Sequence, residues 1–313
     1  MEASVSRGFV DPTLPQNLPR LLEYLSCATG REVSSLSLKE PPRLVNGGGE
    51  NRNYYISAQV DGAPHEFVLR CAPERIPEWR QDWGLYDLER EFRVLQELPA
   101  LKIGLPTPKV YGLSDSLGAP SFLMDLLPGA PLQHNYQPAC RNIVPAYASA
   151  VATISNLDAG SDSWLRKNLT LWTLDKKMAW NEEKSRRFCN EPLTRYSLSW
   201  LREHRPPSRP LVITHGDPNP GNFLTVDNAI TGVVDWEFTY VTDEPLDSLP
   251  RVTWIYEQEE LGAVFCRAMR RDVSDLAWHM VNSLFRAVYV TCSRGRPENE
   301  TRLAEATGFA KGS

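Results

Sequence analysis

Two short stretches carry the strongest signal in this chain of 313 residues: His-Gly-Asp-Pro-Asn-Pro-Gly-Asn at 215–222 and Val-Asp-Trp-Glu at 234–237. They place Asp217, Asn222 and Asp235 at spacings of five and thirteen residues. Phosphoryl transfer from ATP needs such a set, because one carboxylate accepts the proton of an attacking hydroxyl while an amide oxygen and another carboxylate hold magnesium. Apolar runs precede both stretches and predict short buried strands. The three side chains are therefore expected close together at strand ends or on a tight loop.

Each stretch alone also has an ordinary structural explanation. A His-Gly-Asp sequence can form a simple turn, and Asp235 can simply end a strand. Chance explains the combination poorly, because both stretches occur at a suitable spacing and each follows an apolar run. The functional interpretation is therefore favoured over the structural one.

The region resembles the catalytic core of the aminoglycoside phosphotransferase/choline kinase-like family, whose pattern is close to His-Gly-Asp-x-x-x-x-Asn followed by Asp-Trp-Glu. The similarity extends from about residue 47 to about residue 247. It implies that Asp217 is the catalytic base and that His215 helps to fix the loop. It also implies that Asn222 and Asp235 are magnesium ligands and that Glu237 supports the site.

The same resemblance implies an α+β, bilobal protein-kinase-like fold. Its N-terminal lobe would be an antiparallel β-sheet with a helix, and its C-terminal lobe would be larger and mostly helical. The predicted boundaries are 1–122 for the N-terminal nucleotide-binding lobe, 123–130 for the hinge and 131–313 for the C-terminal lobe that carries catalysis and acceptor binding. The sequence pattern is compatible, since helical candidates dominate after Pro131: 144–157, 174–203 and 261–292.

A glycine triplet, Gly47-Gly48-Gly49, lies between two predicted strands. Glycines let backbone N–H groups approach phosphate oxygens because no Cβ blocks the way, although a plain flexible hairpin is the alternative. By resemblance, the triplet and Asn51 contact the nucleotide. Glu50 departs from the family pattern, which usually has a serine at that position.

Arg70 ends an apolar strand-like segment, where the resemblance implies a lysine that contacts the α- and β-phosphates and pairs with a glutamate on the next helix. Arginine keeps the charge and can bind phosphate through two N–H groups. Glu91 is the expected partner and Glu89 the alternative, while a solvated strand-end arginine is the competing explanation. In the predicted hinge, the backbone of Met124 and Leu126 is expected to bind adenine.

Composition narrows the partners and the compartment. The net charge of -5 gives no reason to expect a nucleic acid partner, and no apolar run approaches the ~20 residues that span a bilayer. The N-terminus shows no secretory signal, and the six cysteines form no Cys-x-x-Cys pair. These features predict a cytoplasmic protein with reduced thiols, no membrane association and no zinc site. They leave the oligomeric state open.

The leading hypothesis is an enzyme, a small-molecule kinase that uses ATP, or alternatively GTP, with magnesium to phosphorylate a hydroxyl. The acceptor would be a small hydroxylated molecule. The acidic segment from Asp243 to Glu260 predicts that it is cationic, unless these carboxylates merely solvate a helix. One alternative is a catalytically weak or inactive nucleotide-binding module, motivated by Glu50 and Arg70. A protein kinase is disfavoured because Asp-Phe-Gly and Ala-Pro-Glu are absent after Asp235.

Overall fold

The computed structural model consists of two compact units. Unit 1 contains Met1–Gly129 and Thr231–Phe238, and unit 2 contains Ala130–Ile230 and Thr239–Ser313. Asp235 therefore groups with unit 1, whereas the predicted boundaries put it in the C-terminal lobe; those boundaries stay a prediction. The structure describes residues 9–45, 51–73, 87–132, 142–158, 160, 162–188, 191–248, 259–272, 276–292 and 298–308.

Unit 1 is built on an antiparallel sheet in the order β1-β3-β4-β6-β5, with β2 paired to β3. Asp61-Gly62 is a hairpin signal in the sequence, and the hairpin is present: the two residues have φ values of 52° and 79° and join β3 to β4. The strand-like sequence of residues 36–45 predicts one continuous strand, but the structure has two short ones, because Pro41 and Pro42 lack the N–H groups that a ladder requires. The strands are β1 (Leu36–Leu38), β2 (Arg43–Leu44), β3 (Arg52–Val60), β4 (Ala63–Cys71), β5 (Val110–Ser114) and β6 (Ser121–Asp125).

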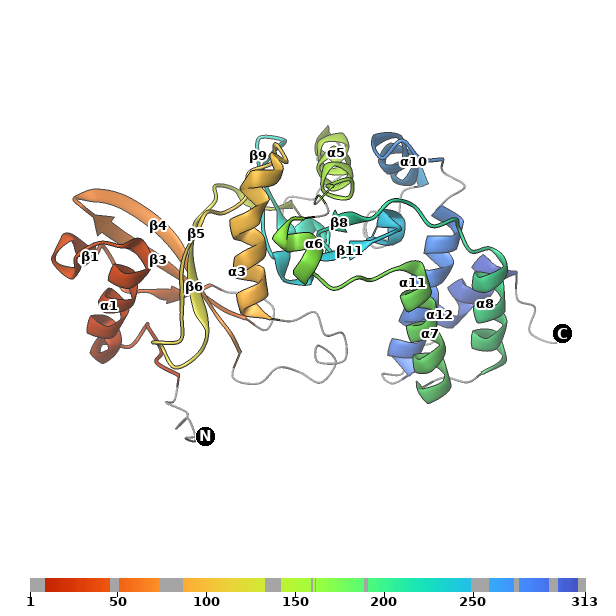
Figure 1. The fold of residues 1–313 in the computed structure, drawn as a ribbon, viewed down its shortest axis with the longest axis horizontal. Helices are drawn as coiled ribbons and strands as arrows, with labels where there is room; N and C mark the ends of the chain where they lie inside the picture. The colour runs from red at the N-terminus through yellow and green to blue at the C-terminus, as the bar shows by residue number, and fades with distance from the viewer. Residues whose placement is uncertain are drawn as a thin grey trace. The chain divides into compact units, whose positions relative to one another are not determined.

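Two helices cover opposite faces of this sheet (Figure 1). Helix α1 (Leu18–Thr29) packs its buried leucines against Leu123 and its neighbours on one face, and Gly30 ends the helix with a φ of 67°. Helix α3 (Leu88–Glu97) packs on the other face, where the rings of Phe92 and Phe122 lie 5.6 Å apart. Neighbouring residues of a strand point to opposite faces, so Phe122 and Leu123 join the sheet to both helices.

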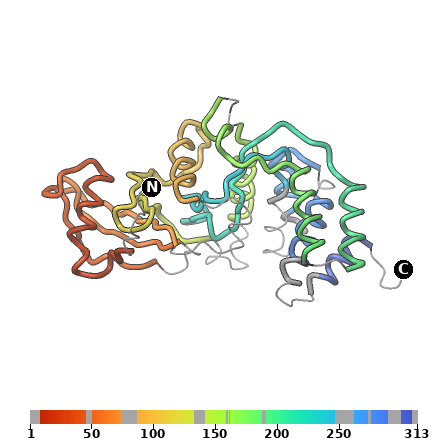
Figure 2. Tube along the Cα trace, turned by 60° about the horizontal axis from the view of Figure 1, so that its bottom comes forward, coloured from red at the N-terminus to blue at the C-terminus, as the bar shows by residue number. Residues whose placement is uncertain are grey.

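Unit 2 is mostly helical, with two small sheets. A hydrophobic cluster joins α7, α8, α11 and α12, which lie side by side in Figures 1 and 2. Strands β8 and β11 pair with each other, while β7, β9 and β10 form a three-stranded sheet. The helices are α5 (Val144–Ile154), α6 (Trp164–Asn168), α7 (Leu174–Phe188), α8 (Pro192–Glu203), α10 (Glu259–Ala268), α11 (Leu276–Cys292) and α12 (Glu298–Thr307); the strands are β7 (Ala130–Pro131), β8 (Val212–Thr214), β9 (Phe223–Val226), β10 (Ala229–Val233) and β11 (Tyr240–Thr242).

Two of the predicted long helices are each divided into two. The segment 174–203 contains α7 and α8, because Pro192 starts a new helix at its first position, where the missing N–H costs least. The segment 261–292 contains α10 and α11, and Arg270 has a left-handed φ of 55° just after α10. None of the described helices is long and apolar enough to cross a membrane.

Candidate active site

The predicted catalytic loop of unit 2 follows strand β8 and is held mainly by hydrogen bonds between residues close together in the chain. The side-chain amide of Asn222 donates to the backbone oxygen of Asp217 at 2.9 Å. The backbone N–H of Asn219 donates to the same oxygen at 2.7 Å, and the side-chain oxygen of Asn219 accepts from Gly221 at 3.0 Å. These bonds close the loop into one turn of 3-10 helix at Pro220–Asn222. The structure therefore brings Asp217 and Asn222 together, as the sequence predicts.

Two buried aromatic side chains, His215 and Tyr147, contact the backbone of this loop. His215 is buried, its ring nitrogen Nδ1 lies 3.4 Å from the backbone nitrogen of Asp217, and its ring lies 6.2 Å from that of Phe223. Tyr147, on α5, donates its hydroxyl to the backbone oxygen of Pro218 and packs its ring against Phe223 at 4.7 Å. Tyr147 was not predicted from the sequence, where its only signal is an aromatic residue within a predicted helix.

In unit 1, Arg70 lies at the centre of three carboxylates. Its Nε is 2.8 Å from Glu91 Oε2, which confirms the predicted pairing of Arg70 with Glu91. Its Nη2 is 2.5 Å from Asp235 Oδ1 and 3.1 Å from Glu237 Oε2. The sequence did not predict the last two contacts, which join residues more than 160 positions apart. Arg70, Glu91 and Glu237 are buried, whereas the Asp235 side chain is 30% exposed.

The charges of this cluster perturb one another. Burial acts against the Arg70 guanidinium, but Glu91, Asp235 and Glu237 outweigh burial and raise the pKa of Arg70 above its ordinary value. Burial raises the pKa of Glu91 to about 8, helped by the nearby carboxylates Asp235 and Glu237 and opposed by Arg70. One cation for three carboxylates leaves an excess of negative charge among these four groups. The excess favours a proton on Glu91 near neutral pH.

Glu237 connects the cluster to the strand that follows the glycine triplet. Its Oε2 accepts a hydrogen bond of 2.7 Å from the side-chain amide of Asn51, and both side chains are buried. Arg90 donates to the backbone oxygen of Glu237 at 2.5 Å. Asn51 was predicted to contact the nucleotide, and this bond occupies part of its amide group. Glu237 therefore supports the site through two predicted nucleotide-binding residues, Asn51 and Arg70.

The backbone of Asp235 is unusual for an aspartate. Its φ is 66°, in the left-handed region that residues with a Cβ seldom adopt, and such conformations cost ~1–3 kcal/mol. Two features restrain the backbone on either side. The ring nitrogen of Trp236 donates to the oxygen of Val233 at 3.0 Å, and Val233 donates its N–H to Pro106 at 2.9 Å. The strained conformation directs the Asp235 carboxylate to Arg70.

Oxygen ligands for magnesium remain on both predicted metal residues. The Asn222 amide nitrogen is engaged with Asp217, so its Oδ1 is the atom available to a cation. Asp235 uses Oδ1 for Arg70, and its Oδ2 makes no hydrogen bond with a described residue. A carboxylate and an amide oxygen are the hard ligands that magnesium prefers, so this donor set fits the ion.

The predicted adenine-binding residues lie in and after β6. Met124 is inside the sheet, paired with Val68 on β4 and Val110 on β5. Leu126 donates its N–H to Glu66 at 3.0 Å, so its carbonyl is the group left for a nucleotide. Gly47, Gly48, Gly49 and Glu50 lie outside the described residues. Adenine and phosphate binding by these residues stays a prediction.

The described carboxylates of the acidic segment have partners within the fold. Asp243 accepts the N–H of Leu174 at the start of α7 at 2.8 Å. Glu244 forms two contacts of 3.2 Å with Arg271 and is completely buried. Neither carboxylate therefore supports the predicted cationic acceptor. The other acidic side chains of the segment, Asp247, Glu257, Glu259 and Glu260, lie outside what the structure describes.

The comparisons with known proteins agree on one family and one fold. A family model described as the phosphotransferase enzyme family matches residues 42–247. The macrolide 2'-phosphotransferase MphH from Brachybacterium faecium has a similar structure, with a TM-score of 0.60, 18% identity, and coverage of 94% of this chain and 99% of that one. The streptomycin-ATP-APH(2")-IIa ternary complex has a TM-score of 0.63, 14% identity, and coverage of 94% and 98%.

A third solved structure is a thermostable mutant of aminoglycoside phosphotransferase APH(4)-Ia in a ternary complex with ADP and hygromycin B. Its TM-score is 0.58 and its identity 17%, and the match covers 88% of this chain and 96% of that one. At such identities, structural likeness establishes the fold alone. The predicted α+β, bilobal protein-kinase-like fold is confirmed.

Proposed function

This chain belongs to the phosphotransferase enzyme family, and we propose that it is a small-molecule kinase that transfers the γ-phosphate of ATP to an acceptor hydroxyl. The observation that carries the proposal is the buried pair of Arg70 and Glu91, with Asp235 also bonded to Arg70. Kinase-like folds use a strand cation paired with a helix glutamate to position the nucleotide phosphates, and a nearby aspartate to hold magnesium. Here β4 supplies the cation and α3 the glutamate.

In the proposed reaction, Asp217 accepts the proton of the acceptor hydroxyl while the hydroxyl oxygen attacks the γ-phosphorus. The new bond joins that oxygen to phosphorus, the bond from phosphorus to the β,γ-bridging oxygen breaks, and ADP leaves with the electron pair. Asn222 and His215 keep Asp217 in position through the loop contacts. A positioned general base typically contributes ~10²–10⁴-fold in rate.

Magnesium, when bound, would neutralise the charge of the triphosphate and of the leaving ADP. Asn222 Oδ1 and Asp235 Oδ2 are the proposed ligands. Arg70 would bind the phosphates through Nη2, the nitrogen that contacts Asp235 and Glu237 in this structure. The phosphates would thereby substitute for one carboxylate, so the guanidinium would exchange one anionic partner for another.

The runner-up is a catalytically weak or inactive nucleotide-binding module of the same fold. The observation that favours it is the enclosure of Arg70 by three carboxylates, which makes its release to a nucleotide costly. Calorimetric titration with ATP and magnesium, run beside an ATP-turnover assay, separates the two proposals. Binding without turnover on any acceptor would favour the module, whereas turnover that Asp217→Asn abolishes would favour the kinase.

The acceptor would be found by mass spectrometry with ATP, or GTP as the alternative donor, and a library of hydroxylated metabolites and antibiotics. Amino sugars and amino alcohols test the prediction of a cationic acceptor, while neutral sugars and macrolides serve as the contrast. A cationic acceptor attracted by acidic groups should bind more weakly as salt rises, because the Debye length is only ~8 Å at physiological ionic strength. If the best acceptor is neutral, the prediction of a cationic acceptor is wrong, but the proposal that the protein is a kinase still stands.

A further inference from the structure

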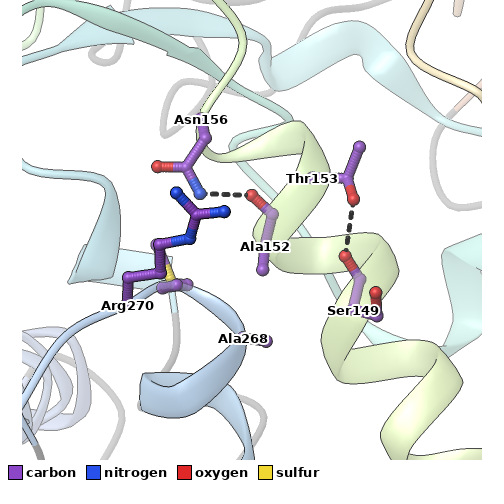
Figure 3. A pocket seen from close by; sticks show the side chains of 7 residues that line it. Ser149, Ala152, Thr153, Asn156, Ala268 and Arg270 are labelled. Carbon is purple, nitrogen blue, oxygen red and sulfur yellow. Dashed lines mark hydrogen bonds between the residues drawn. The ribbon is translucent and has the colours of Figure 1, made fainter.

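A pocket of about 400 Å³ lies in unit 2 between α5 and the turn that follows α10. Figure 3 shows its walls: Ser149, Thr153 and Asn156 come from α5 and its end, and Ala268 and Arg270 come from the end of α10. The catalytic loop residues Asp217 and Asn222 do not line it. The pocket is therefore separate from the proposed catalytic machinery.

A second pocket of about 300 Å³ adjoins the first. The two share Asn156, Met269 and Arg270, and the second adds Arg209 and Arg271. The two volumes are in the range of pockets that bind small molecules, ~300–1,000 Å³. Their walls are mixed: apolar side chains such as Val212 and Met269 lie beside polar and charged ones.

The walls of the paired pockets are cationic. Three arginines line them, and no carboxylate side chain does so among the described residues. The charge of Arg271 is balanced within the protein by buried Glu244. Arg270 forms no ion pair with any residue that the structure describes, and its side chain points toward Asn156 across the first pocket (Figure 3). Arg270 is thus the charge most available to a ligand.

The backbone at Arg270 makes an arginine there unexpected. Its φ of 55° is left-handed, and the N–H of the next residue returns to the oxygen of Cys266 at 2.8 Å, which ends α10. Glycine usually occupies this position because it avoids the cost of a Cβ. A cation near the end of a helix is itself mildly favourable, which is the competing explanation for the arginine. The two explanations predict different behaviour when Arg270 becomes glycine.

We propose that the paired pockets bind a small phosphate-bearing molecule, with its phosphate held by Arg270 and with Arg209 in the same wall. A guanidinium presents a planar set of donors that matches phosphate oxygens. The amide nitrogen of Asn156 is engaged with the oxygen of Ala152 at 2.7 Å, which leaves its Oδ1 to accept from a ligand hydroxyl. This inference does not depend on the proposed phosphoryl transfer.

The test is calorimetric titration of the full chain with inorganic phosphate and, separately, with glycerol phosphate. Saturating ADP and magnesium are present throughout, so that the nucleotide site is filled. Arg270→Gly is the decisive variant, because glycine suits the left-handed backbone and the protein should remain at least as stable. We expect Arg270→Gly to weaken glycerol phosphate binding at least about tenfold, since it removes a charged hydrogen-bond donor.

Two further variants separate a built site from general electrostatic attraction. Arg267→Ala is the matched control, because Arg267 is exposed near the end of α10 and lines neither pocket. The affinity of this variant for glycerol phosphate should stay within about twofold of the wild-type value. Thr153→Glu puts a carboxylate into the first pocket from an exposed helix position and should also weaken binding about tenfold. The proposal is overturned if the wild-type protein binds neither probe, or if Arg270→Gly and Arg267→Ala behave alike.

Discussion

In unit 2, the proposed catalytic loop is held mainly by hydrogen bonds between residues two to five positions apart, whereas in unit 1, Arg70 is held by charges from segments far apart in the chain. The loop contacts are mostly neutral and include backbone groups of the loop itself. The Arg70 contacts are ionic, buried, and supplied by α3 and by the segment 235–237. Removing one side chain should therefore have different consequences for stability in the two regions.

Neutral contacts within a loop are individually weak, with a net value of ~0.5–1.5 kcal/mol each. Removing the partner of a buried charge costs more free energy, because the desolvation of the remaining charge is no longer compensated. We therefore expect substitutions in the loop to affect catalysis more than folding. Substitutions in the charged cluster should affect folding as well as nucleotide binding.

The largest effect should come from Asp217→Asn. The amide has nearly the shape of the carboxylate, so the loop should persist, but it cannot accept the proton of the acceptor. We expect turnover to fall by ~10²–10⁴-fold while the midpoint of urea denaturation and the affinity for ATP barely change. Steady-state kinetics on the identified acceptor measure this. Wild-type turnover in the variant would show that Asp217 is not the base.

Arg70→Ala should give the largest loss of stability. It leaves Glu91, Asp235 and Glu237 together without their cation, and breaking a buried ion pair from one side costs ~3–5 kcal/mol. Arg70→Lys should lose less stability than Arg70→Ala, because lysine keeps the positive charge although it lacks the planar donor group of arginine. Urea denaturation of both variants gives the comparison, with Arg93→Ala on the exposed side of α3 as control. A stability equal to that of the control would refute the electrostatic account of unit 1.

Sequence reasoning succeeded where contacts are local. The tight turn at 217–222, the hairpin signal Asp61-Gly62, and the amphipathic pattern of α1 with Gly30 as its stop each depend on residues close together in the chain, and the structure has all three. The pairing of Arg70 with Glu91 was also predicted, but only because the family resemblance supplies a strand cation and a helix glutamate.

The long-range contacts were beyond such reasoning. Nothing in the spacing of residues indicates that Glu237 accepts hydrogen bonds from both Asn51 and Arg70, since this depends on how the sheet and the segment 235–237 pack. The helices predicted at 174–203 and 261–292 are longer than the observed ones for a related reason. Apolar periodicity continues across Pro192 and across Arg270, but a new helix begins at Pro192 and α10 ends just before Arg270.

Asp235→Ala and Asn222→Ala compare the two regions as metal ligands. Partners that only orient a metal ligand typically contribute ~10–100-fold to metal affinity, so a direct carboxylate ligand should contribute at least as much. We expect Asp235→Ala to weaken magnesium-dependent ATP binding at least tenfold and Asn222→Ala to weaken it less, because the amide is neutral. Calorimetric titrations of ATP with and without magnesium measure the difference. Equal losses, or none, would contradict the proposed ligand pair.

The raised pKa of Glu91 gives a pH-dependent effect with a definite sign. Its folded-state pKa of about 8 lies above the ordinary value of 4.5, so the folded protein holds an extra proton between these values. The resulting stabilisation is complete below pH ~4.5 and is lost as pH rises toward 8, with a slope of up to ~1.4 kcal/mol per pH unit. Glu91→Gln cannot titrate, so it should lack this part of the slope in denaturation curves from pH 5 to 8. Parallel pH profiles for the two proteins would mean that Glu91 stays ionised beside Arg70.

The smallest effect should come from Tyr147→Phe, which tests how neutral support of the catalytic loop compares with the charges of unit 1. The substitution removes the hydroxyl that donates to the oxygen of Pro218 but keeps the ring packed against Phe223 and Phe265. We expect a loss of ~0.5–1.5 kcal/mol in the free energy of unfolding, with a modest fall in kcat and little change in KM for ATP. If Tyr147→Phe instead cost as much stability as Arg70→Ala, a single neutral hydrogen bond would be equivalent to a buried cation with three carboxylate partners. The contrast between the two regions would then have to rest on packing around Tyr147 rather than on charge.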